Sequence, residues 1–213
     1  FKVNELERFP INIKASDNNK ININNNIKKI ISNKRKLKQL GDINFNEICS
    51  KYSSKNGLSL EKIIESSNFK NKLYSGRARK IRNYTININS NIITIYLDKS
   101  SSGKYEVIKF EESDRYKRKF VKYYLENLSD EKINKIDENF EGNILNKTLE
   151  VKIPDYNKTH VVKKIVREWE NLRKQKKELK EITSKFDKEI DQMIYEIYHL
   201  TNEEIEIIEE KYK

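Results

Sequence analysis

A seam of apolar residues constrains the last third of this 213-residue chain more than any other feature. The seam repeats every three or four positions from Val162 to Leu200, with Lys176 as its one charged member and no Gly or Pro inside it. This spacing predicts a helix over 161–200, which at ~1.5 Å per residue would be about 60 Å long. Because such a helix is unstable alone in water, we expect it to pack on a second helix, either as one continuous helix or as a hairpin kinked near Thr183.

Helical spacing also precedes the seam. The apolar residues between Ile27 and Leu40 predict a helix over 27–40 that ends at Gly41 and is a natural partner for the seam. The Asn-rich run 18–26 predicts a surface loop, whose last three Asn are candidate caps for this helix. We expect further helices over 45–52, from Ser59 onward, and over 114–125, 129–140 and 202–210.

The centre of the chain changes to an alternation of period two. Residues 85–89, 92–97 and 104–110 predict a three-stranded antiparallel meander, with turn residues at 99–103. Residues 149–153 predict one more strand, which Pro154 ends. The fold class that we expect is α+β and predominantly helical. It has a long C-terminal helix or helical hairpin packed on N-terminal helices, and a small antiparallel meander of three to four strands.

Three regions follow from this pattern. We expect a linker and N-terminal helix over 1–40, a mixed α/β insert over 41–158 and a long helical brace with an acidic tail over 159–213. The single Cys excludes an internal disulfide framework and a Cys-rich zinc site, and is typical of a reducing cytoplasm. No apolar run is long enough to span a bilayer, so we expect no membrane partner.

Charge is distributed unevenly, and this is the strongest functional indication in the sequence. The formal net charge is +11, yet residues 187–210 hold nine acids against one Lys, a net of −8, so the remainder carries +19. A balance of this kind favours a polyanionic partner for most of the chain and repels that partner from the C-terminal end. We therefore expect a binding module for a polyanion.

The segment 66–97 is the sharpest basic region, because it contains six basic residues and no acid. Arg binds guanine edges or phosphates with two hydrogen bonds, Lys neutralises phosphate, and Gly and Ser allow the backbone to approach a duplex. The alternative is an ordinary solvated basic face. The candidate DNA-binding residues are Lys70, Lys72, Tyr74, Ser75, Arg77, Arg79, Lys80 and Arg82.

Two further basic clusters lie at helical spacing opposite apolar stripes, where solvated helix faces are the alternative to phosphate contacts. These secondary candidates are Lys34, Arg35, Lys36 and Lys38 on the first helix, and Arg115, Lys117, Arg118 and Lys119 on the helix after the meander.

Catalytic motifs are nearly absent. The sequence contains no G-x-S-x-G, H-E-x-x-H or Walker loop, and we predict no catalytic or metal-binding residue in this chain. His160 and His199 are far apart in sequence, and Cys49 has no His beside it. One near-match is Glu150 with Lys152, an E-x-K triplet of the kind found in Mg²⁺-dependent nucleases; Asp137 and Glu141 would be its further carboxylates.

Two segments resemble a known family. Residues 191–209 (DQMIYEIYHLTNEEIEIIE) resemble the closing signature D-x-x-[VI]-Y-x-[LI]-Y-x-L-T-x-x-E-[IV] of adenine-specific DNA methyltransferases with a TaqI-like C-terminal specificity domain, including fused type IIG restriction-modification enzymes. His199 stands where Gly is common in that signature. Residues 5–11 (ELERFPI) resemble the passage that precedes the final helices of the same enzymes.

The resemblance implies that this chain is the target-recognition part of such an enzyme. A catalytic part, with an S-adenosylmethionine pocket and an Asn-Pro-Pro-Tyr/Phe motif for methyl transfer to adenine N6, would precede Phe1. Neither motif occurs here, so we expect no cofactor in this chain and two partners, double-stranded DNA and the upstream methyltransferase domain. The closing signature would brace the recognition surface.

Two alternatives remain open. The long seam could serve a helical scaffold that mediates protein assembly without binding DNA, and Glu150 with Lys152 could serve a Mg²⁺-dependent nuclease. RNA is a further possible ligand, because phosphate contacts carry no sequence information.

Overall fold

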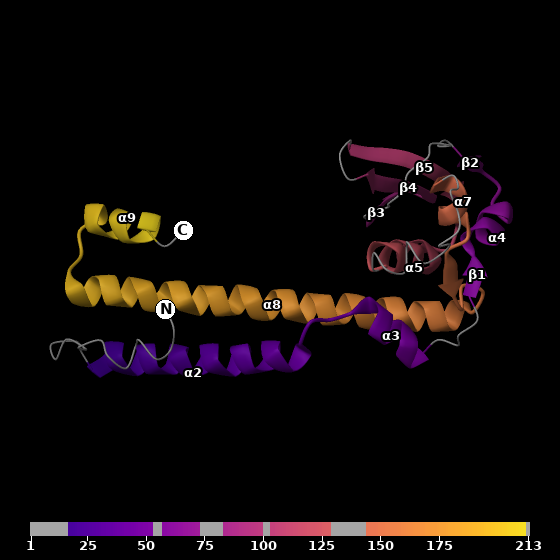
Figure 1. The fold of residues 1–213 in the computed structure, drawn as a ribbon. Helices are drawn as coiled ribbons and strands as arrows, with labels where there is room; N and C mark the ends of the chain where they lie inside the picture. The colour runs from indigo at the N-terminus through magenta and orange to yellow at the C-terminus, as the bar shows by residue number, and fades with distance from the viewer. Residues whose placement is uncertain (1–16, 53–56, 73–82, 100–102, 129–143, 212–213) are drawn as a thin grey trace. The chain divides into compact units, whose positions relative to one another are not determined.

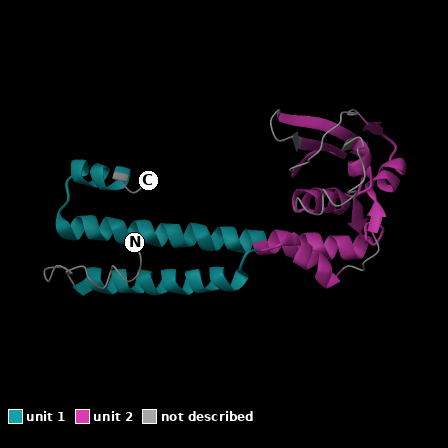
Figure 2. Cartoon of the chain, viewed as in Figure 1, with its two compact units in different colours: residues 1–42, 173–213 teal, residues 43–172 magenta. Residues whose placement is uncertain are grey.

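The computed structural model describes residues 17–52, 57–72, 83–99, 103–128 and 144–211, and its fold is α+β and predominantly helical, as predicted (Figure 1). It divides into two compact units, unit 1 (residues 1–42 and 173–213) and unit 2 (residues 43–172) (Figure 2). The elements in chain order are α2 (Asp17–Leu40), α3 (Phe45–Tyr52), β1 (Gly57–Ser59), α4 (Leu60–Glu65), β2 (Lys70–Lys72), β3 (Asn83–Asn89), β4 (Ile92–Lys99), β5 (Gly103–Glu111), α5 (Arg115–Glu126), α7 (Ile144–Leu149), β6 (Lys152–Pro154), α8 (Thr159–Tyr198) and α9 (Asn202–Lys211).

The main sheet of unit 2 is antiparallel with the strand order β2-β5-β4-β3. Strands β3, β4 and β5 form the predicted meander, in which Ile86 lies opposite Ile95 and Ile95 opposite Ile108. These three side chains are fully buried, since alternation puts them on the same face of the sheet. The fourth strand is β2, at 70–72, and not the segment 149–153 that the sequence predicted.

Helix α5 protects the outer edge of strand β3. The Ile86 N–H donates to the Glu126 carboxylate (3.1 Å), and Lys122 donates to the Ile86 carbonyl (3.0 Å). An edge strand otherwise presents unpaired backbone groups to other chains. Two side chains on one face of α5 therefore satisfy a backbone position at which the sheet ends.

An aromatic cluster joins three helices of unit 2. The Phe45 ring of α3 lies 5.8 Å from the Phe120 ring and 5.9 Å from the Tyr123 ring of α5, measured between centroids. It also meets the Trp169 ring of α8 at 5.2 Å, nearly edge to face. Offset and edge-to-face pairs add ~0.5–1.5 kcal/mol beyond the burial of the rings. The first part of the apolar seam is thus buried in the core of unit 2.

The segment 149–153 corrects a prediction. Its first residue, Leu149, ends α7 and is buried in the core, and only residues 152–154 form a strand, β6. Strand β6 pairs with β1, where Gly57 lies opposite Pro154. A Cβ at Gly57 would lie 2.9 Å from the Lys152 Cβ, so this Gly permits close strand contact.

In unit 1, α2 lies antiparallel to the C-terminal part of α8. The Asn26 amide donates to the Glu189 carboxylate (3.0 Å), and the Lys29 ammonium lies 4.8 Å from the centroid of the Phe186 ring. Lys176, the one charged residue of the seam, donates to the carbonyl of Gly41 at the end of α2 (2.8 Å). Its position in the seam is explained by this contact, because the last carbonyls of a helix lack partners within the helix.

The Asn-rich run corrects a second prediction. Residues 18–26 are helical and form the first turns of α2, where the sequence predicts a loop. Asn is a poor helix former, costing roughly 0.7 kcal/mol relative to Ala. Here Asn26 is buried and bonded to Glu189, and Ile23, Ile27 and Ile30 continue the apolar face. Tertiary packing outweighs local propensity in this segment.

Helix α8 is continuous over 40 residues and does not form the alternative hairpin. At Thr183, where a kink would divide the helix, the hydroxyl donates to the carbonyl of Leu179 (2.6 Å) and the helix continues. The boundary between the two units falls within α8, between Leu172 and Arg173. The predicted region boundary at 158/159 coincides instead with the start of this helix.

The closing signature forms a helix end followed by a new helix start. His199 has a φ of 53°, and the Leu200 N–H donates to the carbonyl of Tyr195 (3.0 Å), as in a Schellman motif. The Thr201 N–H then donates to the Glu204 carboxylate (2.9 Å), and the Glu204 N–H donates to the Thr201 hydroxyl oxygen (3.3 Å). These two reciprocal hydrogen bonds are a capping box for α9. These residues of the signature therefore have a structural explanation here.

One predicted helix, over 129–140, lies outside the described residues. In the part of the chain that the structure describes, no helix has the length and apolar character needed to cross a membrane.

The left-handed backbone at His199 predicts a stabilising substitution. We expect His199→Gly to raise the midpoint of thermal unfolding, because a Cβ costs up to about 1 kcal/mol in this conformation. Circular dichroism at 222 nm measures this midpoint. His199→Val should lower it, since a β-branched residue is still less compatible with positive φ. A lower midpoint for His199→Gly would contradict the assignment of His199 as the helix stop.

Candidate nucleic-acid interface

The structure describes two members of the primary basic segment. Lys70 and Lys72 lie exposed on the edge strand β2, opposite Phe110 and Ile108 of β5. Residues directly opposite in an antiparallel pair share a face, so both Lys lie on the apolar side of the sheet at its edge, an arrangement that discourages pairing with another strand. The other six predicted DNA-binding residues, Tyr74, Ser75, Arg77, Arg79, Lys80 and Arg82, lie outside the described residues.

The secondary cluster of α2 belongs to unit 1. Its four cations all lie exposed in the last two turns of α2, and among the described residues none of them has a carboxylate partner. They are Lys34, Arg35, Lys36 and Lys38.

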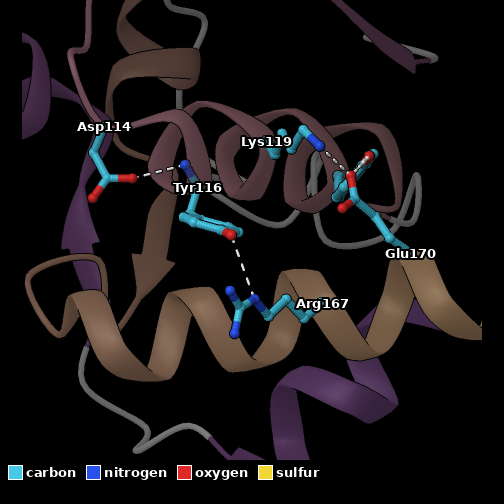
Figure 3. Close-up of polar contacts among 6 residues, drawn as sticks. Asp114, Tyr116, Lys119, Arg167 and Glu170 are labelled. Carbon is cyan, nitrogen blue, oxygen red and sulfur yellow. Dashed lines mark hydrogen bonds and ion pairs between the residues drawn. The ribbon is translucent and has the colours of Figure 1, made fainter.

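The other secondary cluster lies in α5, whose position is fixed by a cap. The Asp114 carboxylate accepts hydrogen bonds from the N–H groups of Tyr116 (2.7 Å) and Lys117 (3.2 Å) (Figure 3). An Asp at this position accepts hydrogen bonds from N–H groups that have no partner within the helix. Its negative charge also interacts favourably with the positive N-terminal end of the helix dipole. The cap therefore sets the direction in which the first turn of α5 presents its side chains.

The four predicted cations of α5 have different roles. Arg118 donates to the carbonyls of Glu112 (2.6 Å) and Ser113 (2.8 Å), which ties down the loop before the helix. Lys117 lies 4.8 Å from the centroid of the Tyr156 ring. Lys119 is bonded to a carboxylate, and Arg115 is the one exposed residue of the four. The sequence grouped these four residues, and their environments in the structure distinguish them.

Arg115 is part of a cation cluster that the sequence did not reveal. Its guanidinium carbon lies 5.1 Å from the centroid of the Tyr116 ring, and the Lys163 ammonium of α8 lies 5.4 Å from the same point. Arg167, one turn further along α8, lies at 5.5 Å and donates from Nε to the Tyr116 hydroxyl oxygen (3.4 Å) (Figure 3). We call Tyr116 with Arg115, Lys163 and Arg167 the Tyr116 cluster.

The electrostatics of the Tyr116 cluster are strongly positive. The hydrogen bond from Arg167, helped by the charges of Arg167, Arg115 and Lys163, lowers the pKa of the Tyr116 hydroxyl below its ordinary value despite opposing desolvation. Within the described ranges, none of the three cations forms an ion pair with a carboxylate. The cluster therefore concentrates positive charge around one aromatic ring and one hydroxyl group.

Two acids of α8 neutralise other cations of unit 2. Glu170 accepts hydrogen bonds from Lys119 (2.6 Å) and from the Tyr123 hydroxyl (2.8 Å), which fixes α5 on α8. Glu168 accepts from Lys51 (3.0 Å) and from the Tyr52 hydroxyl of α3. These carboxylates are committed to helix packing, and neither forms an ion pair with a cation of the Tyr116 cluster.

Lys163 and Arg167 were not predicted, because the apolar seam dominates the sequence pattern of α8. The two residues are four positions apart and therefore share one helix face. That face lies beside the buried stripe of Val162, Ile165 and Val166. A search for basic residues at this spacing on the seam helix would have found them, but only the contact with α5 shows that they meet Arg115.

The described residues give little support to the nuclease alternative. Glu150 is exposed after α7 and Lys152 begins β6, while Asp137 and Glu141 lie outside the described ranges. No three His, Cys, Asp or Glu side chains that the structure describes come together as a group able to hold a metal ion. This function stays a prediction.

The contact between α5 and α8 predicts a pH dependence. Burial opposes the ionisation of Glu170, but the hydrogen bonds from Lys119 and Tyr123 outweigh it, and the pKa of Glu170 lies below its usual value. A carboxyl group with a lowered pKa stabilises the fold above its unfolded pKa of about 4.3 and loses that contribution as pH falls through the folded pKa. We expect Glu170→Gln to lose less stability than the wild type between about pH 5 and pH 3.

Trp169 is the one Trp of the chain and is buried in unit 2, so its fluorescence during thermal unfolding measures this effect. Glu150→Gln, which removes an exposed carboxyl group elsewhere in unit 2, is the matched control and should follow the wild type. Equal pH profiles for the wild type and Glu170→Gln would contradict the role of Glu170.

Comparisons with known proteins leave the family open. No family model matches the chain, and no curated protein or solved structure matches it. The resemblance of the closing segment to adenine-specific methyltransferases therefore rests on the residues themselves.

Proposed function

We propose that this chain binds double-stranded DNA through a face of unit 2 that includes the Tyr116 cluster. We further propose that it acts as the target-recognition part of an adenine-specific DNA methyltransferase or type IIG restriction-modification enzyme in the cytoplasm. The observation that carries the first proposal is the convergence of Arg115, Lys163 and Arg167 on Tyr116, where none of the three forms an ion pair with a carboxylate among the described residues.

Three neighbouring cations repel one another, so their proximity has to be compensated. The ring of Tyr116 offsets part of the repulsion, at ~0.5–1 kcal/mol for an exposed cation–π contact. A phosphodiester would compensate it more fully, because Arg and Lys form short, charge-assisted hydrogen bonds to phosphate oxygens. The Tyr116 hydroxyl is a further donor to such an oxygen.

The ligand class follows from the wider distribution of charge. Residues outside 187–210 carry +19, and the acid-free segment 66–97 belongs to the same unit as the Tyr116 cluster. Duplex DNA presents one negative charge per ~1.7 Å of its axis, so it engages many cations at once, whereas a small anion engages a few. In this proposal Lys70, Lys72 and the basic residues that follow them contact the same ligand.

The closing segment supports the second proposal. The residues that match the signature form a helix stop and a capping box, which fits the bracing role that the resemblance implies. In such an enzyme the S-adenosylmethionine pocket belongs to the catalytic part upstream. This chain would position the duplex so that the target adenine reaches that pocket by base flipping.

The first test replaces the cations of the Tyr116 cluster. We expect the triple variant R115Q/K163Q/R167Q to bind a random-sequence duplex more weakly than the wild type. The slope of log K against log salt concentration should become less steep by about 2.7, at ~0.9 for each phosphate that is no longer neutralised. Fluorescence anisotropy of a labelled duplex across a salt series measures both quantities.

The matched control is K174Q/K177Q/K185Q, which removes the same charge from three exposed Lys of α8, each within 3.9 Å of a Glu four residues away. Its salt slope should stay close to that of the wild type. Equal weakening in the two triple variants would mean that net charge alone drives binding. An RNA duplex that binds more tightly than DNA would overturn the choice of nucleic acid.

The second test addresses target recognition. Selection of bound duplexes from a random-sequence library should enrich one short motif, because a specificity domain reads base edges in addition to phosphates. Sequencing of successive rounds measures the enrichment. Binding that is salt-sensitive yet enriches no motif would leave DNA binding intact and refute the recognition role.

A further inference from the structure

Unit 1 carries two opposite charge clusters, each without ion pairs among the described residues. Exposed Lys34, Arg35, Lys36 and Lys38 in the last turns of α2 form the first, which we call the basic end. Helix α9 forms the second, the acidic end, whose five Glu are all exposed. They are Glu203, Glu204, Glu206, Glu209 and Glu210.

The acidic end also includes carboxylates of α8. Helix α9 folds back beside α8 (Figure 1), and burial, together with the negative charges of Asp187 and Glu209, raises the pKa of Asp191. Burial and the charges of Asp191 and Glu209 likewise raise the pKa of Tyr195. Residues 187–210 hold nine acids against one Lys, so negative charge is in excess at this end of unit 1.

The two ends are too far apart to neutralise one another. The contacts of Gly41 with Lys176 and of Asn26 with Glu189 place the basic end beside residues near 179 of α8. Glu209 acts on residues 191 and 195, so about 14 residues, or about 20 Å of helix, separate the ends. This distance exceeds the Debye length of ~8 Å at physiological ionic strength.

Unit 1 also leaves apolar side chains uncovered. Four of the five large hydrophobic residues that are most exposed in the described chain belong to it: Ile21, Ile182, Tyr198 and Ile207. Among the residues of unit 1 that the structure describes, the buried apolar ones are Ile30 and Ile190, whereas unit 2 holds the continuous core. A helix pair with so little buried apolar surface gains stability from a further packing partner.

We infer that unit 1 pairs with unit 1 of a second copy of this chain in an antiparallel arrangement about a two-fold axis. The basic end of each copy then faces the acidic end of the other. A parallel arrangement would set like charges against each other, so the charge pattern selects the antiparallel one. The interface is isologous, since the same surface serves both copies.

A charge-exchange experiment tests this inference on the full-length chain without DNA. The variant K34E/R35E/K36E makes the basic end acidic, and E206K/E209K/E210K changes the net charge of α9 from −4 to +2 while leaving the Thr201–Glu204 cap intact. By sedimentation velocity at low salt the wild type should be dimeric and each variant monomeric. An equimolar mixture of the two variants should be dimeric again, because opposite charges then meet at both ends.

The controls separate this inference from the proposed function. R115Q/K163Q/R167Q, which alters unit 2 only, should dimerise like the wild type even where it binds DNA weakly. The wild-type dimer should dissociate towards 1 M salt, where the Debye length falls to ~3 Å. A monomeric wild type, a salt-insensitive dimer or a mixture that stays monomeric would overturn the inference. Circular dichroism shows whether each variant is helical. A variant that is not helical is replaced by the corresponding Gln variant, which removes the charges without reversing their sign and should weaken the dimer.

Discussion

The apolar stripe of α8 is the constraint on which both units depend. In unit 2 its first turns contribute Ile165, Val166 and Trp169 to a core that also contains the sheet and α5. In unit 1 its later turns contact α2, with Phe186 beside Lys29 and Glu189 bonded to Asn26. One helix without Gly or Pro therefore provides packing surfaces of two kinds, one almost wholly apolar and one mixed with polar contacts. The polar contacts fix the register of α2, because a buried amide and its carboxylate partner tolerate no shift along the helix.

The periodic parts of the fold were predictable, and the reasons are local. The alternation around Ile86, Ile93 and Ile95 specified the meander, and the three-and-four spacing of the seam specified α8 within two residues at either end. Predictions failed where long-range contacts decide the structure. The Asn-rich start of α2 is helical where Asn26 donates a hydrogen bond to Glu189 of α8, and residues 70–72 form strand β2 because they pair with β5. Neither contact leaves a periodic trace in the sequence.

The candidate site was predictable only in part for the same reason. Charge counts singled out Arg115 and its neighbours, but they gave the same weight to Lys119, which Glu170 neutralises, and to Arg118, which binds backbone carbonyls. Lys163 and Arg167 lie some 50 residues further along the chain. Only the packing of α5 on α8 brings them to Tyr116. The six residues of the primary segment beyond Lys72 lie outside the described residues, so their role stays a prediction.

Cations that form ion pairs and cations that do not contribute differently to the stability of this fold. An exposed ion pair contributes roughly 0–1 kcal/mol, so pairs such as Lys51 with Glu168 add modestly to the packing of helices. The three cations of the Tyr116 cluster form no ion pair, and their favourable contact with a carboxylate is limited to the longer-range attraction between Arg115 and Glu170, so their mutual repulsion opposes folding. The same holds for the four cations that end α2. Stability alone therefore accounts for neither cluster, and this is the physical reason for proposing an anionic partner at each one: a nucleic acid at the Tyr116 cluster, and the Glu-rich α9 of a second copy at the end of α2.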